Sequence, residues 1–159
     1  MKIPHYYWDA NAFLTVIKKE KGYESFEAII EIAEKGEAKI VTSALTLTEV
    51  IKLKGRQPMQ MGDEPVIKGF FKRDYLVIQN VDRQLAEQAR QLIWEQKLNP
   101  KDAIHVASAL AFGHKIDEMH TSDGQLLKLN VFKGLKITTP NIRIQGNLPL
   151  PITPKNPAD

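Results

Sequence analysis

Short runs rich in β-branched and aromatic residues alternate along the chain with longer segments whose apolar residues recur at helical spacing. The predicted strands are 5–8, 38–42, 75–78, 118–121 and 136–139. The predicted helices are 12–19, 25–35, 44–54, 64–73, 83–97 and 100–112. Glycines 36, 55 and 113 follow three of these helices as stop signals. This alternation predicts an α/β sandwich, in which helices cover a parallel sheet.

The composition fits one compact domain, because 43% of the 159 residues are hydrophobic and 26% are charged. A core of this size needs no disulfide or metal for stability alone. The absence of cysteine excludes a disulfide scaffold, a thiolate zinc site and a cysteine nucleophile. We therefore expect a cytoplasmic protein with one folded domain over 1–146. The segment 147–159 is rich in proline and cannot be helical, so it is either an extended arm or a docking peptide.

The charge balance gives only a weak indication of a partner. Lys and Arg number 22 and Asp and Glu number 19, so the formal net charge is +3. Such a small excess permits an acidic partner such as nucleic acid without identifying one. No segment approaches the roughly 20 apolar residues of a membrane span, and the first residues lack the apolar core of a signal peptide. We expect a protein that is neither exported nor inserted into a membrane.

Four acidic residues stand where predicted strands end or where the next helix opens: Asp9, Glu49, Asp102 and Asp123. Each of these residues also has a structural explanation that requires no functional site. Asp9 can cap a helix and Asp102 can occupy a first helical turn. Glu49, two turns into its predicted helix, can pair with a nearby cation, and Asp123 precedes glycine in a turn or a short helix. Ligands of parallel α/β sheets nevertheless collect at the carboxyl ends of strands, so the shared placement favours one site.

A cluster of four carboxylates requires a cation. Two carboxylates about 4 Å apart repel each other by roughly 4 kcal/mol at an effective dielectric constant near 20. Hard oxygen ligands without thiolate favour Mg²⁺ or Mn²⁺. One or two such ions activate water for in-line attack on a phosphodiester. The sequence therefore predicts hydrolytic phosphoryl chemistry.

The segments around these acidic residues resemble the four motifs of the PIN-domain family, metal-dependent ribonucleases that include the VapC-type toxins of toxin–antitoxin pairs. The segments are 8–11 (WDAN), 42–50 (TSALTLTEV), 101–107 (KDAIHVA) and 121–123 (TSD). Their acidic residues lie 40, 53 and 21 positions apart, in the order of the family motifs. The match covers most of the chain. It departs from the family at Ala10, where a hydroxyl residue is common, and in the proline-rich tail.

The resemblance implies a three-layer α/β/α sandwich with a parallel five-stranded sheet. It also implies that Asp9, Glu49, Asp102 and Asp123 are the catalytic and metal-binding residues, supported by Asn11 and Thr121. His105 and His120 are interpreted as packing residues beside the acidic groups, because histidine does not ligate the metal in the resembling motifs. The basic run of Lys52, Lys54 and Arg56 either contacts RNA phosphates or lies on a solvated helix end.

The resemblance implies a Mg²⁺- or Mn²⁺-dependent endoribonuclease that leaves 5′-phosphate and 3′-hydroxyl ends, acts as a toxin on RNA and pairs with a small antitoxin protein. A homodimer is compatible with it. The alternative is a non-catalytic PIN-fold module that binds RNA or a protein. Four filled acidic positions favour the enzyme. A phosphatase-like hydrolase is disfavoured, because the chain has no glycine-rich phosphate loop and no nucleophile motif.

Overall fold

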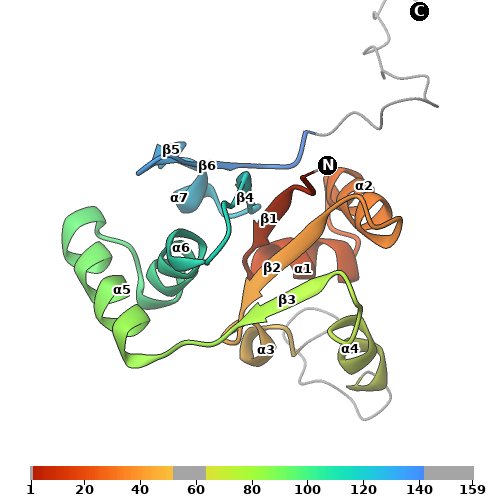
Figure 1. Cartoon of the computed structure of the whole chain (residues 1–159), viewed down its shortest axis with the longest axis horizontal. Helices are drawn as coiled ribbons and strands as arrows, with labels where there is room; N and C mark the ends of the chain where they lie inside the picture. Colours follow the sequence, from red (N-terminus) through yellow and green to blue (C-terminus); the bar gives the residue numbers. More distant parts are fainter. Residues whose placement is uncertain (1, 52–63, 142–159) are drawn as a thin grey trace, which may run out of the picture.

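The computed structural model describes residues 2–51 and 64–141 (Figure 1). The helices and strands, in chain order, are β1 His5–Trp8, α1 Ala10–Ile17, α2 Tyr23–Glu34, β2 Lys39–Ser43, α3 Thr46–Glu49, α4 Glu64–Phe70, β3 Leu76–Gln79, α5 Arg83–Gln96, α6 Pro100–Ala111, β4 Glu118–His120, α7 Gly124–Leu127, β5 Val131–Phe132 and β6 Leu135–Thr138. None of the helices in these two ranges is long and apolar enough to cross a membrane. The predicted domain boundary at 146 and the tail 147–159 lie outside the described residues.

The strands form one sheet in the order β3-β2-β1-β4-β6-β5, with β1 near its centre (Figure 1). The five predicted strands are all present and pair in parallel. The expected count of five was wrong by one, because the two-residue strand β5 pairs antiparallel with β6 at the edge of the sheet. Lys133 and Gly134 connect these strands with positive φ angles of 48° and 81°, as a tight two-residue hairpin turn requires. A strand of two residues is too short for a periodic sequence signal.

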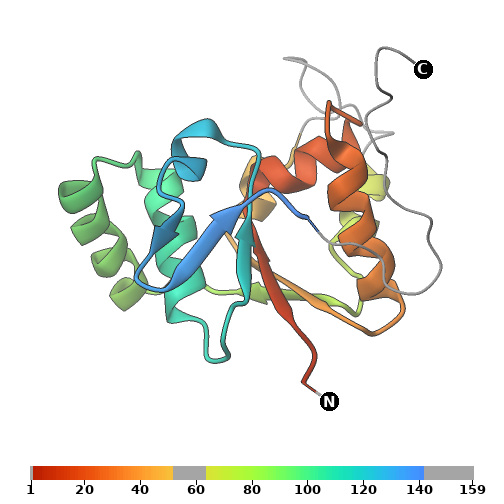
Figure 2. The same ribbon diagram turned by 90° about the horizontal axis from the view of Figure 1, so that it is seen from above.

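Helices cover both faces of the sheet, so the expected three-layer sandwich is confirmed (Figure 2). Because side chains alternate along a strand, neighbouring residues of β1 enter different cores. Tyr7 packs with α5 and α6 in one core. Tyr6 and Trp8 pack with α1 and α2 in the other. All three side chains are buried, and β1 therefore joins the two halves of the molecule.

The helix predicted over 44–54 is much shorter in the structure. Helix α3 ends at Glu49, which is therefore its last residue and does not lie two turns inside a helix. A hydroxyl group competes with the helical backbone here, because Thr48 Oγ1 donates to the Leu45 carbonyl at 2.7 Å. Val50 leaves the helix with φ −90° and ψ 75°. Positions 52–54 of the predicted helix and Gly55 lie outside the described residues.

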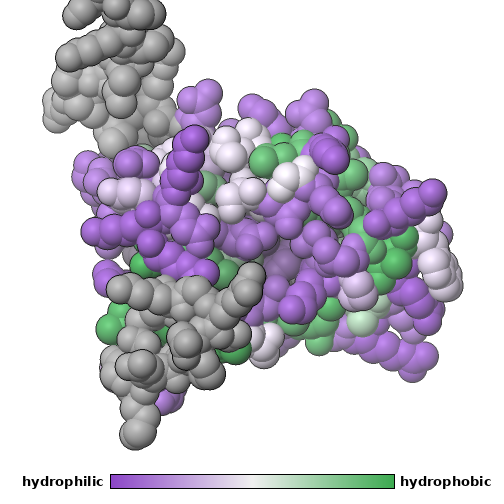
Figure 3. Space-filling view, turned by 180° about the vertical axis from the view of Figure 1, so that it is seen from behind, coloured by the Kyte–Doolittle hydropathy of each residue, from purple (hydrophilic) through white to green (hydrophobic). Residues whose placement is uncertain are grey.

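The face of the molecule in Figure 3 is mainly hydrophilic, and its hydrophobic side chains form small groups. Across the described ranges, large hydrophobic side chains with marked exposure include Val66, Trp94 and Val131. Isolated exposed apolar residues are normal on soluble domains. The stability of the fold therefore depends on the two cores.

We predict that Ile40→Ala lowers the free energy of unfolding by about 2 to 5 kcal/mol, because Ile40 is fully buried in β2 and truncation leaves a cavity. Ile3→Ala is the matched control, since Ile3 is 38% exposed, and its effect should stay below about 1 kcal/mol. Urea denaturation followed by circular dichroism measures both. Equal losses in the two variants would contradict the placement of this core.

Candidate functional site

Three of the four acidic residues that the sequence singled out line one cleft at the carboxyl edge of the sheet. Asp9, Glu49 and Asp102 are on the wall of this cleft, whose volume is about 360 Å³. Asp123 is not a lining residue but lies next to the cleft: Asn11 lines the cleft, and its Nδ2 donates to Asp123 Oδ2 at 3.4 Å. The structure therefore brings together residues from β1, α3, α6 and the end of β4.

Asp9 follows β1 directly and has two roles at once. Its Oδ1 accepts a hydrogen bond from the Ala12 backbone N–H at 3.0 Å, so it caps α1 as its structural explanation suggested. Its Oδ2 accepts a hydrogen bond from Thr121 Oγ1 at 2.5 Å. Burial raises the pKa of Asp9 to about 6, and the charge of Asp102 contributes to the rise. The hydrogen bonds from Thr121 and Ala12 oppose this rise without cancelling it, and a protonated His105 would oppose it further.

Asp102 lies in the first turn of α6, and its backbone N–H donates to Asn99 Oδ1, which caps the helix. The Asn99 side chain returns a hydrogen bond to Asp102 Oδ2 at 2.9 Å. Burial raises the pKa of Asp102, and the negative charge of Asp123 adds to the increase, while the bond from Asn99 lowers it. The carboxylate is therefore held in place while its charge remains only partly compensated.

Asp123 caps the short helix α7, since its Oδ1 accepts hydrogen bonds from the backbone N–H groups of Gln125 and Leu126. Thr121 Oγ1 accepts from the Asp123 backbone N–H at 3.0 Å and donates to Asp9. Thr121 thus ties two of the acidic residues together. Both supporting residues expected from the sequence, Asn11 and Thr121, contact members of the acidic set.

Glu49 is held by a buried histidine. Its Oε1 lies 2.7 Å from His105 Nε2, and His105 Nδ1 lies 2.8 Å from the Tyr7 hydroxyl. His105 and Tyr7 are both buried, and burial raises the pKa of Tyr7 well above its ordinary value. Sequence reasoning missed the link to Tyr7, although two signals were available. His105 lies three residues after Asp102 on one helix face, and Tyr7 lies two residues before Asp9 on one face of the strand.

The second histidine belongs to the core. His120 Nδ1 accepts a hydrogen bond from Trp8 Nε1 at 3.1 Å, and its ring stacks on Tyr6 with centroids 4.8 Å apart. Burial lowers the pKa of His120, which favours a neutral ring. This arrangement is that of a packing residue, as the sequence interpretation expected.

The donor set of the cleft suits a hard divalent cation in its chemistry. Carboxylate oxygens are the ligands that Mg²⁺ and Mn²⁺ prefer. Burial, together with neighbouring carboxylates, raises the pKa of Asp9 and of Asp102, so a bound cation would stabilise their ionised forms. Within 2–51 and 64–141, no Lys or Arg forms an ion pair with any of the four acidic residues. The same residues contain no group of three His, Asp or Glu close enough to form a ready metal cluster. An ion held by one or two of these carboxylates would complete its coordination with water.

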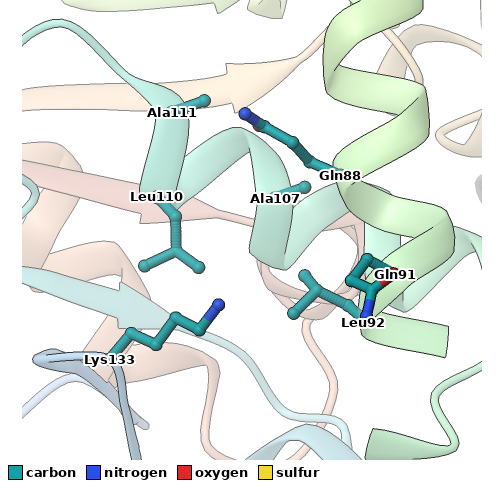
Figure 4. Close-up of a pocket in the computed structure, with 7 residues that line it drawn as sticks. All are labelled: Gln88, Gln91, Leu92, Ala107, Leu110, Ala111 and Lys133. Carbon is teal, nitrogen blue, oxygen red and sulfur yellow. The ribbon is translucent and has the colours of Figure 1, made fainter. Parts of the chain in front are cut away.

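A second cavity, of about 410 Å³, lies between α5, α6 and the turn before β6 (Figure 4). Gln88 and Gln91 from α5 and Leu110 from α6 line it, and Lys133 points toward it from the turn. Lys133 is the only ionisable residue among its lining residues. The lining residues of this cavity therefore offer no carboxylate or imidazole for metal binding. The basic run of Lys52, Lys54 and Arg56 lies outside the described residues.

The sequence matches the family model described as PIN domain over residues 6–131. The chain belongs to the PIN domain family. The matched region of this PIN domain contains all four acidic residues and ends at the first residue of β5. A comparison with curated protein sequences finds no match.

Solved structures with the same fold include toxins of toxin–antitoxin systems. Mycobacterium tuberculosis VapC20, described as a sarcin–ricin loop cleaving toxin, is 16% identical with a TM-score of 0.58, over 82% of this chain and 98% of that chain. A toxin–antitoxin complex from Klebsiella pneumoniae is 20% identical with a TM-score of 0.58, over 86% and 98%. DNA-bound VapBC from Salmonella typhimurium is 18% identical with a TM-score of 0.59, over 85% and 97%. At these identities the likeness establishes a shared fold.

We predict that the metal-free protein loses stability as the pH rises from about 4 to 6. The folded Asp9 has a pKa of about 6 against 3.8 in the unfolded chain, so the folded state binds more protons in this window. This difference in pKa corresponds to about 2 to 3 kcal/mol. Asp9→Asn should remove most of the decline, whereas Glu27→Gln, an exposed site on α2, should keep it. Urea unfolding in EDTA across this pH range measures the effect, and an unchanged decline in Asp9→Asn would refute the assignment.

Proposed function

We propose that this PIN domain is an endoribonuclease that depends on Mg²⁺ or Mn²⁺ and hydrolyses RNA phosphodiester bonds. The observation that carries the proposal is the acidic cleft, where Asp9, Glu49 and Asp102 meet and no described Lys or Arg neutralises them. Bringing several carboxylates together without a compensating Lys or Arg is costly, so a fold that retains this arrangement has a use for it.

The proposed roles follow from the contacts of each side chain. Asp9, Glu49, Asp102 and Asp123 would hold the cation. When bound, Mg²⁺ or Mn²⁺ lowers the pKa of water and stabilises negative charge on a phosphate. Thr121 and Asn11 orient Asp9 and Asp123 through their hydrogen bonds. Lys101 lines the cleft and provides a positive charge for an RNA phosphate.

We further propose that the protein is the toxin of a toxin–antitoxin pair, which acts in the cytoplasm and is neutralised by a small antitoxin protein. The support is the fold shared with VapC20 and with two toxin–antitoxin complexes. A homodimer and RNA contacts by Lys52, Lys54 and Arg56 belong to the same proposal. The antitoxin partner, the homodimer and these RNA contacts can each be tested apart from the acidic cleft, whereas toxicity should depend on the cleft.

A non-catalytic PIN module that binds RNA or a protein is the second candidate. One observation favours it: within the described ranges, no three acidic or histidine side chains stand close enough to form a metal cluster. A binding module would retain affinity for its partner when the acidic residues are neutralised. Cleavage and binding measured on the same variants therefore separate the two candidates.

We predict that the purified protein cleaves single-stranded or loop RNA, that EDTA abolishes cleavage and that Mg²⁺ or Mn²⁺ restores it. Asp102→Asn should remove cleavage and leave the free energy of unfolding in EDTA unchanged or slightly higher. The neutral side chain relieves repulsion from Asp123 and Glu49, which offsets a lost helix-dipole interaction of roughly 0.3 to 1 kcal/mol. Gel analysis of end-labelled RNA and thermal melting of both proteins provide the measurements.

The control for this experiment is Glu27→Gln, purified in the same way, which should cleave normally because Glu27 is exposed on α2. Full activity in EDTA would contradict metal dependence. Near-normal cleavage by Asp102→Asn, or a much lower melting temperature, would show that Asp102 is a structural residue of α6.

We also predict that expression of the protein alone arrests bacterial growth and that Asp102→Asn, expressed at the same level, does not. Co-expression of a small partner encoded beside the gene should relieve the arrest and co-purify with the protein. Growth arrest by both the wild type and Asp102→Asn would show that toxicity does not depend on cleavage. Normal growth with the wild type would refute the proposed toxin function.

A further inference from the structure

The four acidic residues differ in how they are held. Asp9, Asp102 and Asp123 each accept hydrogen bonds from residues within three positions in the sequence. Glu49 instead pairs with His105, which is 56 residues away on another helix. Glu49 also has the longest side chain of the four and ends the four-residue helix α3, so its local structure constrains its carboxylate least.

The contacts around His105 define the direction of its hydrogen bonds. A carboxylate accepts hydrogen bonds only, so His105 Nε2 donates to Glu49 Oε1 across 2.7 Å. In a neutral imidazole the other nitrogen then has a lone pair, and the Tyr7 hydroxyl donates to Nδ1 across 2.8 Å. Every donor in this chain from Tyr7 through His105 to Glu49 has an acceptor. The burial of Tyr7 and His105 shields the bond between them from water, whereas the bond from His105 to Glu49 borders the cleft.

The same chain connects Glu49 to the elements that carry the other acidic residues. Tyr7 is two residues before Asp9 at the end of β1, and His105 is three residues after Asp102 on α6. These hydrogen bonds therefore fix the position of the Glu49 carboxylate relative to both Asp9 and Asp102. A shift of α3 alone would break the bond to His105.

We propose that Tyr7 and His105 are positioning residues for a divalent cation in the acidic cleft. Tyr7 fixes the Nε2–H tautomer of His105, and His105 in turn holds the Glu49 carboxylate. This inference rests on the proposed function and adds two residues to it. Hydrogen bonds from outer residues orient metal-binding carboxylates, and their loss typically weakens metal affinity or activity roughly 10- to 100-fold. Neither Tyr7 nor His105 contacts the metal or the RNA in this role.

The β1 strand offers a matched control. Tyr6 and Tyr7 are adjacent and buried, but they face opposite sides of the sheet and enter different cores. Tyr7→Phe removes the hydroxyl that contacts His105 and keeps the ring in the core. Tyr6→Phe removes a hydroxyl from the other face, where the ring stacks on His120. Both variants lose one oxygen atom from a buried tyrosine of the same strand.

The first measurement is the tautomer of His105 in the wild-type protein without metal. Long-range ¹H–¹⁵N correlation spectra, recorded at a pH where the ring is neutral, should show a proton on Nε2 and none on Nδ1. A neutral ring with its proton on Nδ1 would overturn the proposal. This reading is independent of any cleavage assay.

The second measurement is the affinity for Mn²⁺, determined by electron paramagnetic resonance titration, together with kcat and KM for RNA cleavage. Tyr7→Phe should bind Mn²⁺ about 10-fold more weakly and lose kcat with little change in KM, whereas Tyr6→Phe should match the wild type. His105→Leu should lose more, and His105→Gln, whose amide still donates to Glu49, should recover most of the affinity. Equal Mn²⁺ affinity in wild type, Tyr7→Phe and His105→Leu would overturn the proposal, and so would an equal loss in both tyrosine variants.

The two proposals fail in different ways. A wild-type protein that binds Mn²⁺ but does not cleave RNA refutes the nuclease function, while the order of Mn²⁺ affinities still supports the positioning role. A wild-type protein that does not bind Mn²⁺ overturns the positioning role for a metal ligand. Circular dichroism tests whether each variant is folded. If His105→Leu does not fold, the comparison of Mn²⁺ affinity between Tyr7→Phe, Tyr6→Phe and His105→Gln tests the positioning role.

Discussion

The central position of β1 is the constraint on which the rest of the structure depends. Because β1 pairs with β2 on one side and β4 on the other, its side chains are enclosed by both helical layers. Alternation along the strand sends Tyr6 and Trp8 to one core and Tyr7 to the other. The next residue, Asp9, then begins α1 at the carboxyl edge of the sheet. Packing of the two cores therefore fixes where the first acidic residue of the cleft stands.

The cleft places an electrostatic cost on this scaffold. Burial and neighbouring negative charges raise the pKa values of Asp9 and Asp102, which means that the folded protein disfavours their ionised forms. The fold limits the cost with hydrogen bonds from Thr121, Ala12 and Asn99. These bonds restrain the carboxylates but leave oxygen lone pairs for another ligand. Carboxylates whose ionised forms destabilise the folded protein are typical of sites that were selected for chemistry rather than for folding.

The sequence predicted the five parallel strands and most helices because their residues carry strong periodic and capping signals, as at Asp9, Asn99 and Gly36. It also predicted that acidic residues from distant motifs would meet, since strand ends of a parallel sheet share one edge. It failed at α3, where the Thr48 hydroxyl bonds to the backbone carbonyl of Leu45, and at β5, which is too short for periodicity. The link from Tyr7 to Glu49 depends on three side-chain conformations in the folded state. Residue types and spacing place these residues near one another but do not determine those hydrogen bonds.

The contact between Asp9 and Thr121 spans 112 residues of sequence. During synthesis, β1 leaves the ribosome before its partner β4, and the Thr121 hydroxyl follows Asp9 only after those 112 residues have been added. At about 5 to 20 residues per second, the interval is roughly 5 to 20 seconds. Throughout that interval β1 lacks one of its two neighbours, and Asp9 lacks the hydroxyl that orients it. A nascent or truncated chain that ends before β4 therefore has no assembled cleft, and the protein acquires its acidic site only after β4 and Thr121 have been synthesised.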